Sequence, residues 1–189
     1  MSEIETLVSK YEDQVELPWP KNLAPPERVW FLIYDKTQER RLRPRLGDFK
    51  ARTLAAGHSW LHVDLTNAFA EWMGHHEYRD DYFEQPDAMQ MELADFENSV
   101  ADRIREALTA PEADDQTVVA VVGIGSLFGL VRASDVLPRL EPEIRGRLLV
   151  FFPGSHNGPN YRLLDARDGW NYRAVPISAG VGDLTLWTP

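Results

Sequence analysis

Three uninterrupted apolar runs most constrain what this chain can fold into. They are VWFLIY (29–34), TVVAVV (117–122) and LLVFF (148–152), and each is rich in β-branched or aromatic residues. Strands without polar alternation are covered on both faces, which is typical of a parallel sheet packed between helices. A further strand is predicted at WLHVDL (60–65).

Segments with helical spacing of apolar residues separate these runs. Residues 1–28 combine a short helix with a proline-rich connector. Apolar residues at 42, 46, 49 and 54 predict a helix over 40–56, and the longest apolar stripe predicts another over 85–108. Shorter helices are predicted over 66–74 and 134–140.

The alternation of strands and helices predicts an α/β fold, and the length of 189 residues fits one domain spanning 1–189. We expect a three-layer sandwich whose sheet is mostly parallel. Segments 161–165 and 172–177 flank an Asp168-Gly169 turn and predict a hairpin that forms an antiparallel C-terminal edge. Residues 178–189 are assigned to a tail.

Several classes of protein are excluded by what the chain lacks. It has no cysteine, so disulfides and thiolate chemistry are excluded. No stretch approaches the roughly 18–20 uncharged apolar residues that span a bilayer, and the start lacks the order of a signal peptide. We therefore expect a cytoplasmic protein without membrane contact.

The charge of −10 is unevenly distributed. Residues 36–56 carry seven basic and two acidic side chains, whereas residues 57–116 carry three basic and fifteen acidic ones. Binding to nucleic acid requires clustered lysine and arginine against phosphates, so direct nucleic-acid binding is not expected of a chain with this balance. A basic segment beside a large acidic one favours docking to another protein.

The residues that follow each predicted strand are the candidates for a phosphate or metal site, because open α/β sheets bind ligands at the carboxyl ends of their strands. No strand is followed by a glycine-rich loop that carries a lysine, so the expected fold resembles P-loop NTPases without their phosphate-binding loop, and no cofactor is predicted. Asp35 and Asp64 each end a predicted strand. They either cap the next turn or converge on Mg²⁺, and we expect capping.

Two turns contain residues with a predicted structural role. Gly125, Ser126 and Arg132 follow the strand at 117–122, and Pro153 and Gly154 end the strand at 148–152. Ser126 lacks the Gly-x-Ser-x-Gly context of an activated nucleophile. We expect these residues to hold turns, with Arg132 bonded to nearby carbonyls or a carboxylate.

A partner-binding surface is predicted from two groups of side chains. Basic residues crowd the segment 40–52, and two aromatic residues lie near the C-terminal hairpin, where exposed tryptophan and tyrosine often anchor interfaces. The alternative for the arginines is pairing with the chain's own acidic helix at 85–108, and the alternative for the aromatics is core packing. The predicted surface comprises Arg40, Arg41, Arg43, Arg45, Trp170 and Tyr172.

Several blocks of the sequence also resemble one known family. They are RVWFLIYD (28–35), GHSWLHVDLTNAFAEWM (57–73), VVGIGSLFGLVRASDVLPRLE (121–141), GRLLVFFPG (146–154) and NYRLLDARDGWNYRAVPI (160–177). Together they resemble the BrxB family of BREX bacteriophage-exclusion systems over about residues 3–177. The blocks GSLFG-x-VR-x-S and FFPG are the most distinctive.

The resemblance implies a role in the BREX machinery, which includes a methyltransferase, an ATPase and the alkaline-phosphatase-superfamily protein PglZ. It implies PglZ as a direct partner, with other BREX subunits as further partners, and it transfers no catalytic residue. We therefore expect a non-catalytic assembly or adaptor subunit. The alternative is a Mg²⁺-dependent phosphoryl-transfer or nuclease enzyme that uses Asp35 and Asp64.

Overall fold

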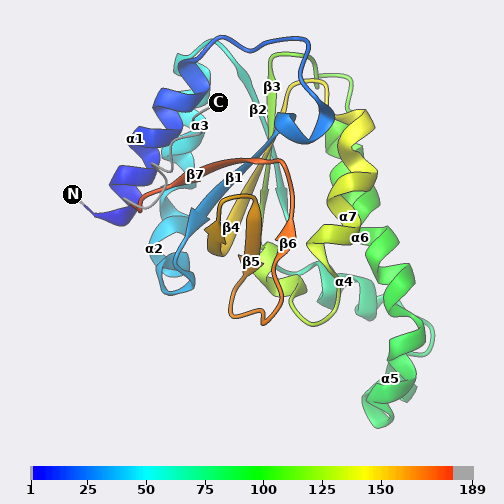
Figure 1. The fold of residues 1–189 in the computed structure, drawn as a ribbon. Helices are drawn as coiled ribbons and strands as arrows, with labels where there is room; N and C mark the ends of the chain where they lie inside the picture. The colour runs from blue at the N-terminus through cyan, green and yellow to red at the C-terminus, as the bar shows by residue number, and fades with distance from the viewer. Residues whose placement is uncertain (1, 181–189) are drawn as a thin grey trace.

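A mostly parallel sheet forms the centre of the molecule (Figure 1). The computed structural model describes residues 2–180. Five strands lie in the order β2-β3-β4-β1-β7, and each is parallel to its neighbours. Their bounds are β1 Val29–Tyr34, β2 Ser59–Asp64, β3 Thr117–Val122, β4 Arg147–Asn157 and β7 Val175–Ser178. The four strands predicted from apolar runs are confirmed.

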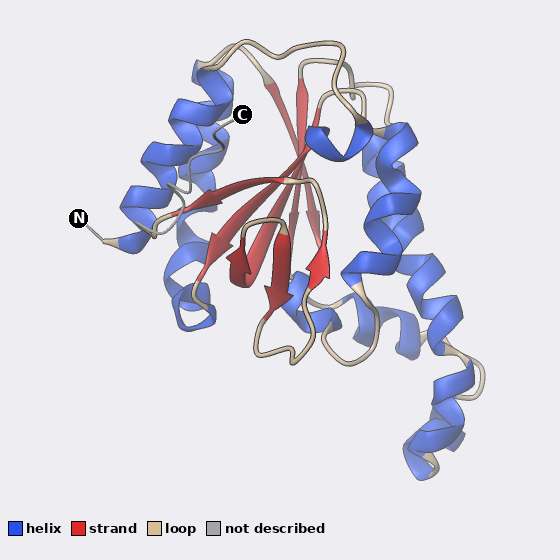
Figure 2. Ribbon diagram, in the orientation of Figure 1, coloured by secondary structure: helices blue, strands red, loops and turns tan. Residues whose placement is uncertain are grey.

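The burial of these strands explains their sequences. Every residue of β1 and β3 is buried, as are the first seven residues of β4, because helices lie against both faces of the sheet (Figure 2). β2 is an edge strand and only Val63 is buried in it, which matches its alternating sequence. Each uninterrupted apolar run therefore occupies a central position, as strands covered on both faces require.

One face of the sheet is covered by α1 (Glu3–Glu16) and α3 (Leu46–Ala55). α1 begins at a capping box, in which Ser2 and Glu5 each bond the other's backbone nitrogen. Tyr11 of α1 and Thr53 of α3 share a buried hydrogen bond of 2.6 Å between their hydroxyl oxygens. This bond links the two helices above the sheet.

The opposite face is covered by α6 (Leu93–Leu108) and α7 (Ala133–Leu140). The apolar stripe predicted for α6 is confirmed, since Phe96, Val100 and Ile104 are buried. Between β2 and α6 the chain forms α4 (Ala68–Gly74), α5 (Arg79–Glu84) and the 3₁₀ helix η4 (Pro86–Met91). No helix within residues 2–180 is long and apolar enough to cross a membrane.

Two predicted helices are interrupted. The segment 40–56 divides into α2 (Glu39–Leu42), the 3₁₀ turn η3 (Arg43–Arg45) and α3, because Pro44 cannot donate a helical hydrogen bond. Within α3 the buried residues are Phe49 and Thr53, whereas Leu54 is exposed, so Leu54 is wrongly assigned to the apolar stripe. The segment 85–108 divides at Glu92, between η4 and α6.

The predicted C-terminal hairpin is confirmed in part: its first segment pairs antiparallel across the Asp168-Gly169 turn, but with 170–171 and not with 172–177. β4 continues beyond the parallel sheet, turns at Gly158 and pairs antiparallel with β5 (Asn160–Leu163), which pairs in turn with β6 (Trp170–Asn171). β7 is parallel to β1 and covers its free edge. The antiparallel strands thus extend from the end of β4, and the strand at the C-terminal edge is parallel.

Candidate functional site

The carboxyl ends of the strands are where an open α/β sheet normally binds ligands. β1 leads to α2 and α3 on one face, whereas β2 and β3 lead to helices on the other face. Asp35 follows β1 and Asp64 ends β2, and β3 and β4 lie between these two strands. Three strand spacings separate the two carboxylates by roughly 14 Å. The structure therefore does not bring Asp35 and Asp64 together as a pair of metal ligands.

Each of these aspartates instead accepts hydrogen bonds from a threonine two residues later. The Thr37 amide donates to Asp35 Oδ1 at 2.8 Å, and the Thr66 amide donates to Asp64 Oδ1 at 2.9 Å. Bonds from Thr37 hold the pKa of Asp35 below its usual value. Both strand ends thus use the same Asp-x-Thr turn, at 35–37 and 64–66.

Partial burial alone would raise the pKa of Asp64, but its bonds from Thr66 and the charge of Arg43 outweigh this effect and lower the pKa. A carboxyl group whose pKa is lowered on folding stabilises the folded state above its unfolded pKa. That contribution is lost as the pH falls through the lowered value. Asp64 is therefore held ionised at neutral pH as part of a polar network.

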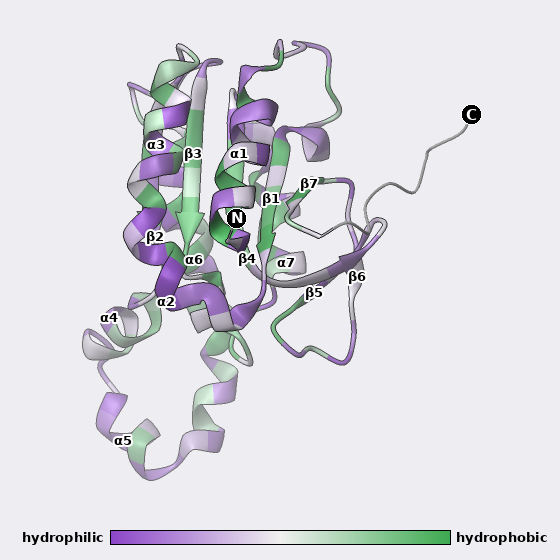
Figure 3. Cartoon of the chain, turned by 90° about the vertical axis from the view of Figure 1, so that its left-hand side faces the viewer, coloured by the Kyte–Doolittle hydropathy of each residue, from purple (hydrophilic) through white to green (hydrophobic). Residues whose placement is uncertain are grey.

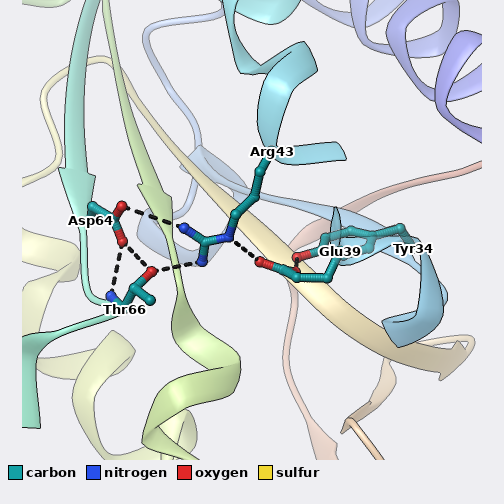
Figure 4. A network of polar contacts seen from close by, with 5 residues as sticks. All are labelled: Tyr34, Glu39, Arg43, Asp64 and Thr66. Atoms are coloured by element: carbon teal, nitrogen blue, oxygen red, sulfur yellow. Dashed lines mark hydrogen bonds and ion pairs between the residues drawn. The ribbon is translucent and has the colours of Figure 1, made fainter. Parts of the chain in front are cut away.

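Arg43 is the centre of this network, which crosses the carboxyl edge of the sheet (Figure 4). Its guanidinium donates to Glu39 Oε1 at 2.7 Å and to Thr66 Oγ1 at 2.6 Å, and it lies 3.5 Å from Asp64 Oδ2. The buried Tyr34 hydroxyl donates to the other Glu39 oxygen at 2.5 Å, and burial raises the pKa of this tyrosine. The network joins the turn after β1 to the end of β2.

Sequence reasoning missed Glu39 and Thr66 as members of this network. The Glu39–Arg43 pair is a helical i,i+4 ion pair, and the repeated Asp-x-Thr pattern marks both turns. These signals are visible in the sequence. The contact that connects them depends on the sheet order, which the sequence did not predict.

Gly123, which follows β3, lies directly against the Asp64-Thr66 turn. Its φ is +81°, and a Cβ at this position would lie 2.5 Å from the Thr66 amide nitrogen and 3.0 Å from Asp64 Oδ1. Gly125 has no positive φ, and its Cβ would lie 3.2 Å from Pro153 Cγ. The glycine that this turn requires is therefore Gly123, and the sequence-based choice of Gly125 is corrected.

The other predicted turn residues differ in what they contact. A Cβ on Gly154 would lie 2.1 Å from the Arg162 carbonyl oxygen, and the Pro153 carbonyl accepts a 2.8 Å bond from the Leu164 amide. These two residues therefore hold the β4–β5 turn region. The Ser126 side chain is exposed, and only its amide takes part, bonding the Gly123 carbonyl at 3.0 Å.

Arg132 does not satisfy a carbonyl or a carboxylate as expected. Its side chain is exposed and has no hydrogen bond or ion pair to any residue in the range 2–180. It lines a cavity of about 500 Å³ between the loop after η5 (Ile124–Leu127) and the segment after β5. Arg132 is therefore a cation without an ion pair in the described residues, and it lies in the lining of this groove.

The aromatic residues expected at an interface belong largely to the core. Tyr172 is buried and its hydroxyl donates to Glu141 Oε1 at 2.7 Å. Trp170 is half-buried, with its ring centroid 5.7 Å from that of Phe152 and 6.1 Å from that of Phe31. Tyr172 therefore packs in the core and Trp170 packs partly in the core, which was the alternative to an interface for these two residues.

The arginines of the basic segment separate into paired and free ones. Arg43 bonds Glu39, Arg45 bonds Asp48, and Arg52 bonds Glu12 of α1 at 2.7 Å. Arg40 and Arg41 are exposed and have no ion pair within residues 2–180. None of these arginines pairs with α6, which lies on the opposite face of the sheet, so the predicted pairing with the acidic helix is wrong.

The fold therefore defines an open, mixed α/β protein with a mostly parallel sheet, an internally bonded carboxyl edge and free arginines on its surface. Among residues 2–180, no three His, Asp or Glu side chains are grouped to hold a metal ion. Residues 62–177 match the model of the family described as BREX protein BrxB. Because this match covers more than half of the chain, the protein belongs to the BrxB family and is a component of BREX phage defence. Searches of curated proteins and of solved structures found no match.

Proposed function

We propose that this protein is a non-catalytic, cytoplasmic docking subunit of the BREX machinery that binds PglZ through Arg40 and Arg41. The observation that carries the proposal is the pair of free guanidinium groups on the exposed helix α2. Their neighbours Arg43, Arg45 and Arg52 are each neutralised by a carboxylate of the same chain. Arg40 and Arg41 therefore offer two adjacent positive charges to another molecule.

The overall charge of the chain supports a protein partner for this pair. A net charge of −10 opposes association with phosphate backbones, so a local positive site best fits an acidic patch on a protein. Charge complementarity of this kind speeds and orients association more than it adds affinity. An adaptor that must find one subunit among several gains specificity from such a site.

The alternative of a Mg²⁺-dependent enzyme has less support. Both candidate carboxylates accept bonds within their own turns, and two strands lie between them. A divalent ion bound through oxygen ligands requires carboxylates that converge on one point. The expected likeness to P-loop NTPases stays a prediction. It is compatible with a docking role, because no strand is followed by a phosphate-binding loop.

Reversing both charges in R40E/R41E tests the proposal. We expect the affinity of the purified protein for purified PglZ to fall by roughly tenfold or more, and the loss to be larger at low salt, since ions screen exposed charges. The melting temperature should stay within about 1 °C of wild type, because neither arginine side chain has an ion pair or hydrogen bond within residues 2–180. Affinity is measured by calorimetry at two salt concentrations.

The matched control is R162E/R173E, which reverses two exposed arginines that also have no ion pair within residues 2–180. This variant changes the net charge equally and should bind PglZ as the wild type does. Equal affinity of R40E/R41E and wild type would contradict docking at α2. A loss shared equally by both variants would show that total charge, and not this surface, governs binding.

A further inference from the structure

The segment between α4 and α6 forms an arm that projects from the body of the molecule. Figures 1 and 3, which view the molecule from two sides, both show α5 at the far end of this arm, away from the sheet. No residue of α5 or η4 is buried. Ordering a segment costs conformational entropy, which is normally compensated by the burial of apolar side chains. α5 and η4 bury no residue, so they contribute little of this compensation themselves.

The exposed side chains of the arm are unusually apolar for a free surface. Tyr78 is 54% exposed, Phe83 70% and Met91 87%. These three are half of the six large apolar side chains that are exposed in residues 2–180. Several large apolar side chains exposed on one short segment are typical of an interaction site. The arm is also acidic, since residues 77–92 contain six acidic side chains and one basic side chain.

A groove with the complementary character lies at the base of the arm. It is the cavity of about 500 Å³ already described, and it has Gln90 and Leu93 on one side and the segments 128–134 and 163–170 on the other. Phe128 and Leu130 give it an apolar wall, and Phe128 is 48% exposed. The lining contains two arginines, Arg132 and Arg167, and one carboxylate, that of Asp168. Both arginines are exposed and have no ion pair in the described chain.

We infer that two copies of this chain exchange arms, with the acidic, apolar arm of each copy seated in the groove of the other. Both halves of the contact occur on one molecule: apolar side chains beside carboxylates on the arm, and apolar side chains beside free guanidiniums in the groove. α5 lies at the far end of the arm (Figure 1), and none of its residues lines the groove of its own chain. A twofold axis uses both contacts twice and closes the assembly as a dimer.

The apolar area available is sufficient for a stable interface. Interfaces of standard size bury roughly 1,200–2,000 Å² in total. A large apolar side chain covers roughly 150–250 Å² when it is fully buried. Tyr78, Phe83, Met91 and Phe128 are between 48% and 87% exposed, so on both copies they supply roughly half or more of such an area. The arginines of the groove and the carboxylates of the arm then set the orientation of the two copies.

A charge exchange between arm and groove tests this inference on the full chain. Variant R132E/R167E makes the groove acidic, and variant D81K/E84K makes the arm basic. Asp81 and Glu84 flank Phe83, and both are exposed without an ion pair in the described residues. We expect wild type to dimerise reversibly in analytical ultracentrifugation. Each variant alone should dimerise roughly tenfold or more weakly, because like charges then face each other.

An equimolar mixture of the two variants should dimerise as wild type does. The basic arm of D81K/E84K fits the acidic groove of R132E/R167E, and the acidic arm of R132E/R167E fits the basic groove of D81K/E84K. R40E/R41E is the control, and its dimerisation should equal that of wild type. A wild type that stays monomeric up to about 100 μM overturns the inference, as does a mixture that associates no better than its components. The inference does not rest on PglZ binding, which is measured separately with R40E/R41E.

Discussion

Replacing Gly123 with alanine is expected to lower the melting temperature by roughly 8–16 °C, corresponding to about 4 kcal/mol in the free energy of unfolding. The positive φ of +81° is strained for any residue with a Cβ. The added methyl would also lie 2.5 Å from the Thr66 amide nitrogen, which is backbone and cannot rotate away. The Asp64-Thr66 turn, and with it the Arg43 network, must then shift.

Gly125→Ala is the matched control for this prediction. Gly125 has no positive φ, and its Cβ would meet two side-chain atoms and no backbone atom, Pro153 Cγ at 3.2 Å and Leu164 Cδ2 at 3.7 Å. We expect a loss of no more than about 1 kcal/mol, measured by thermal and urea unfolding. A larger loss for Gly125→Ala than for Gly123→Ala would show that the turn after β3 is not held as described.

Trp19→Ala is expected to cost about 3 kcal/mol, or roughly 6–12 °C in melting temperature. Trp19 lies in the proline-rich connector, stacks on His58 with ring centroids 3.7 Å apart, and has the Arg147 guanidinium 4.6 Å from its centroid. Arg147 is buried and has no carboxylate partner in residues 2–180. Burial, followed by the nearby charge of Arg28, lowers the pKa of Arg147.

The physical reason for this cost is that the rings of Trp19 and Trp30 stabilise the charge of the Arg147 guanidinium, as a carboxylate would in an ion pair. A cation over an aromatic face is worth roughly 2 kcal/mol when desolvated, and removing the indole also opens the end of β4 to water. Trp19→Phe keeps an aromatic face and should lose less than half as much. Equal losses for Ala and Phe would contradict stabilisation of Arg147 by an aromatic face at position 19.

The central strands could be predicted because their signal is local. β1 and β3 are buried along their whole length, so their sequences carry no polar residue except Thr117 at the start of β3, which is itself buried. The break in the basic helix was also visible, since Pro44 stands in its middle. Thr53 could not be predicted to replace Leu54 in the core, because its partner Tyr11 lies 42 residues away in the chain.

Most of the features that were missed depend on distant contacts. Val175–Ser178 is parallel to β1 because β1 needs a neighbour on its free side, and nothing within the segment itself indicates that partner. Gly123 could not be distinguished from Gly125 and Gly129 by spacing, because the demand for a glycine arises from Thr66, in the turn after the neighbouring strand β2. The free or paired state of each arginine likewise follows from the fold and not from the crowding of charge.

The central claim, that this chain acts by docking within the BREX machinery, is tested most directly by purifying the tagged protein from cells that carry the whole system. The account predicts that PglZ is recovered with wild type and with R162E/R173E in a fixed ratio to the tagged chain. Recovery with R40E/R41E should fall while the amount of the tagged chain stays the same. Recovery of the tagged chain without PglZ, or equal recovery of PglZ with all three proteins, would contradict the account.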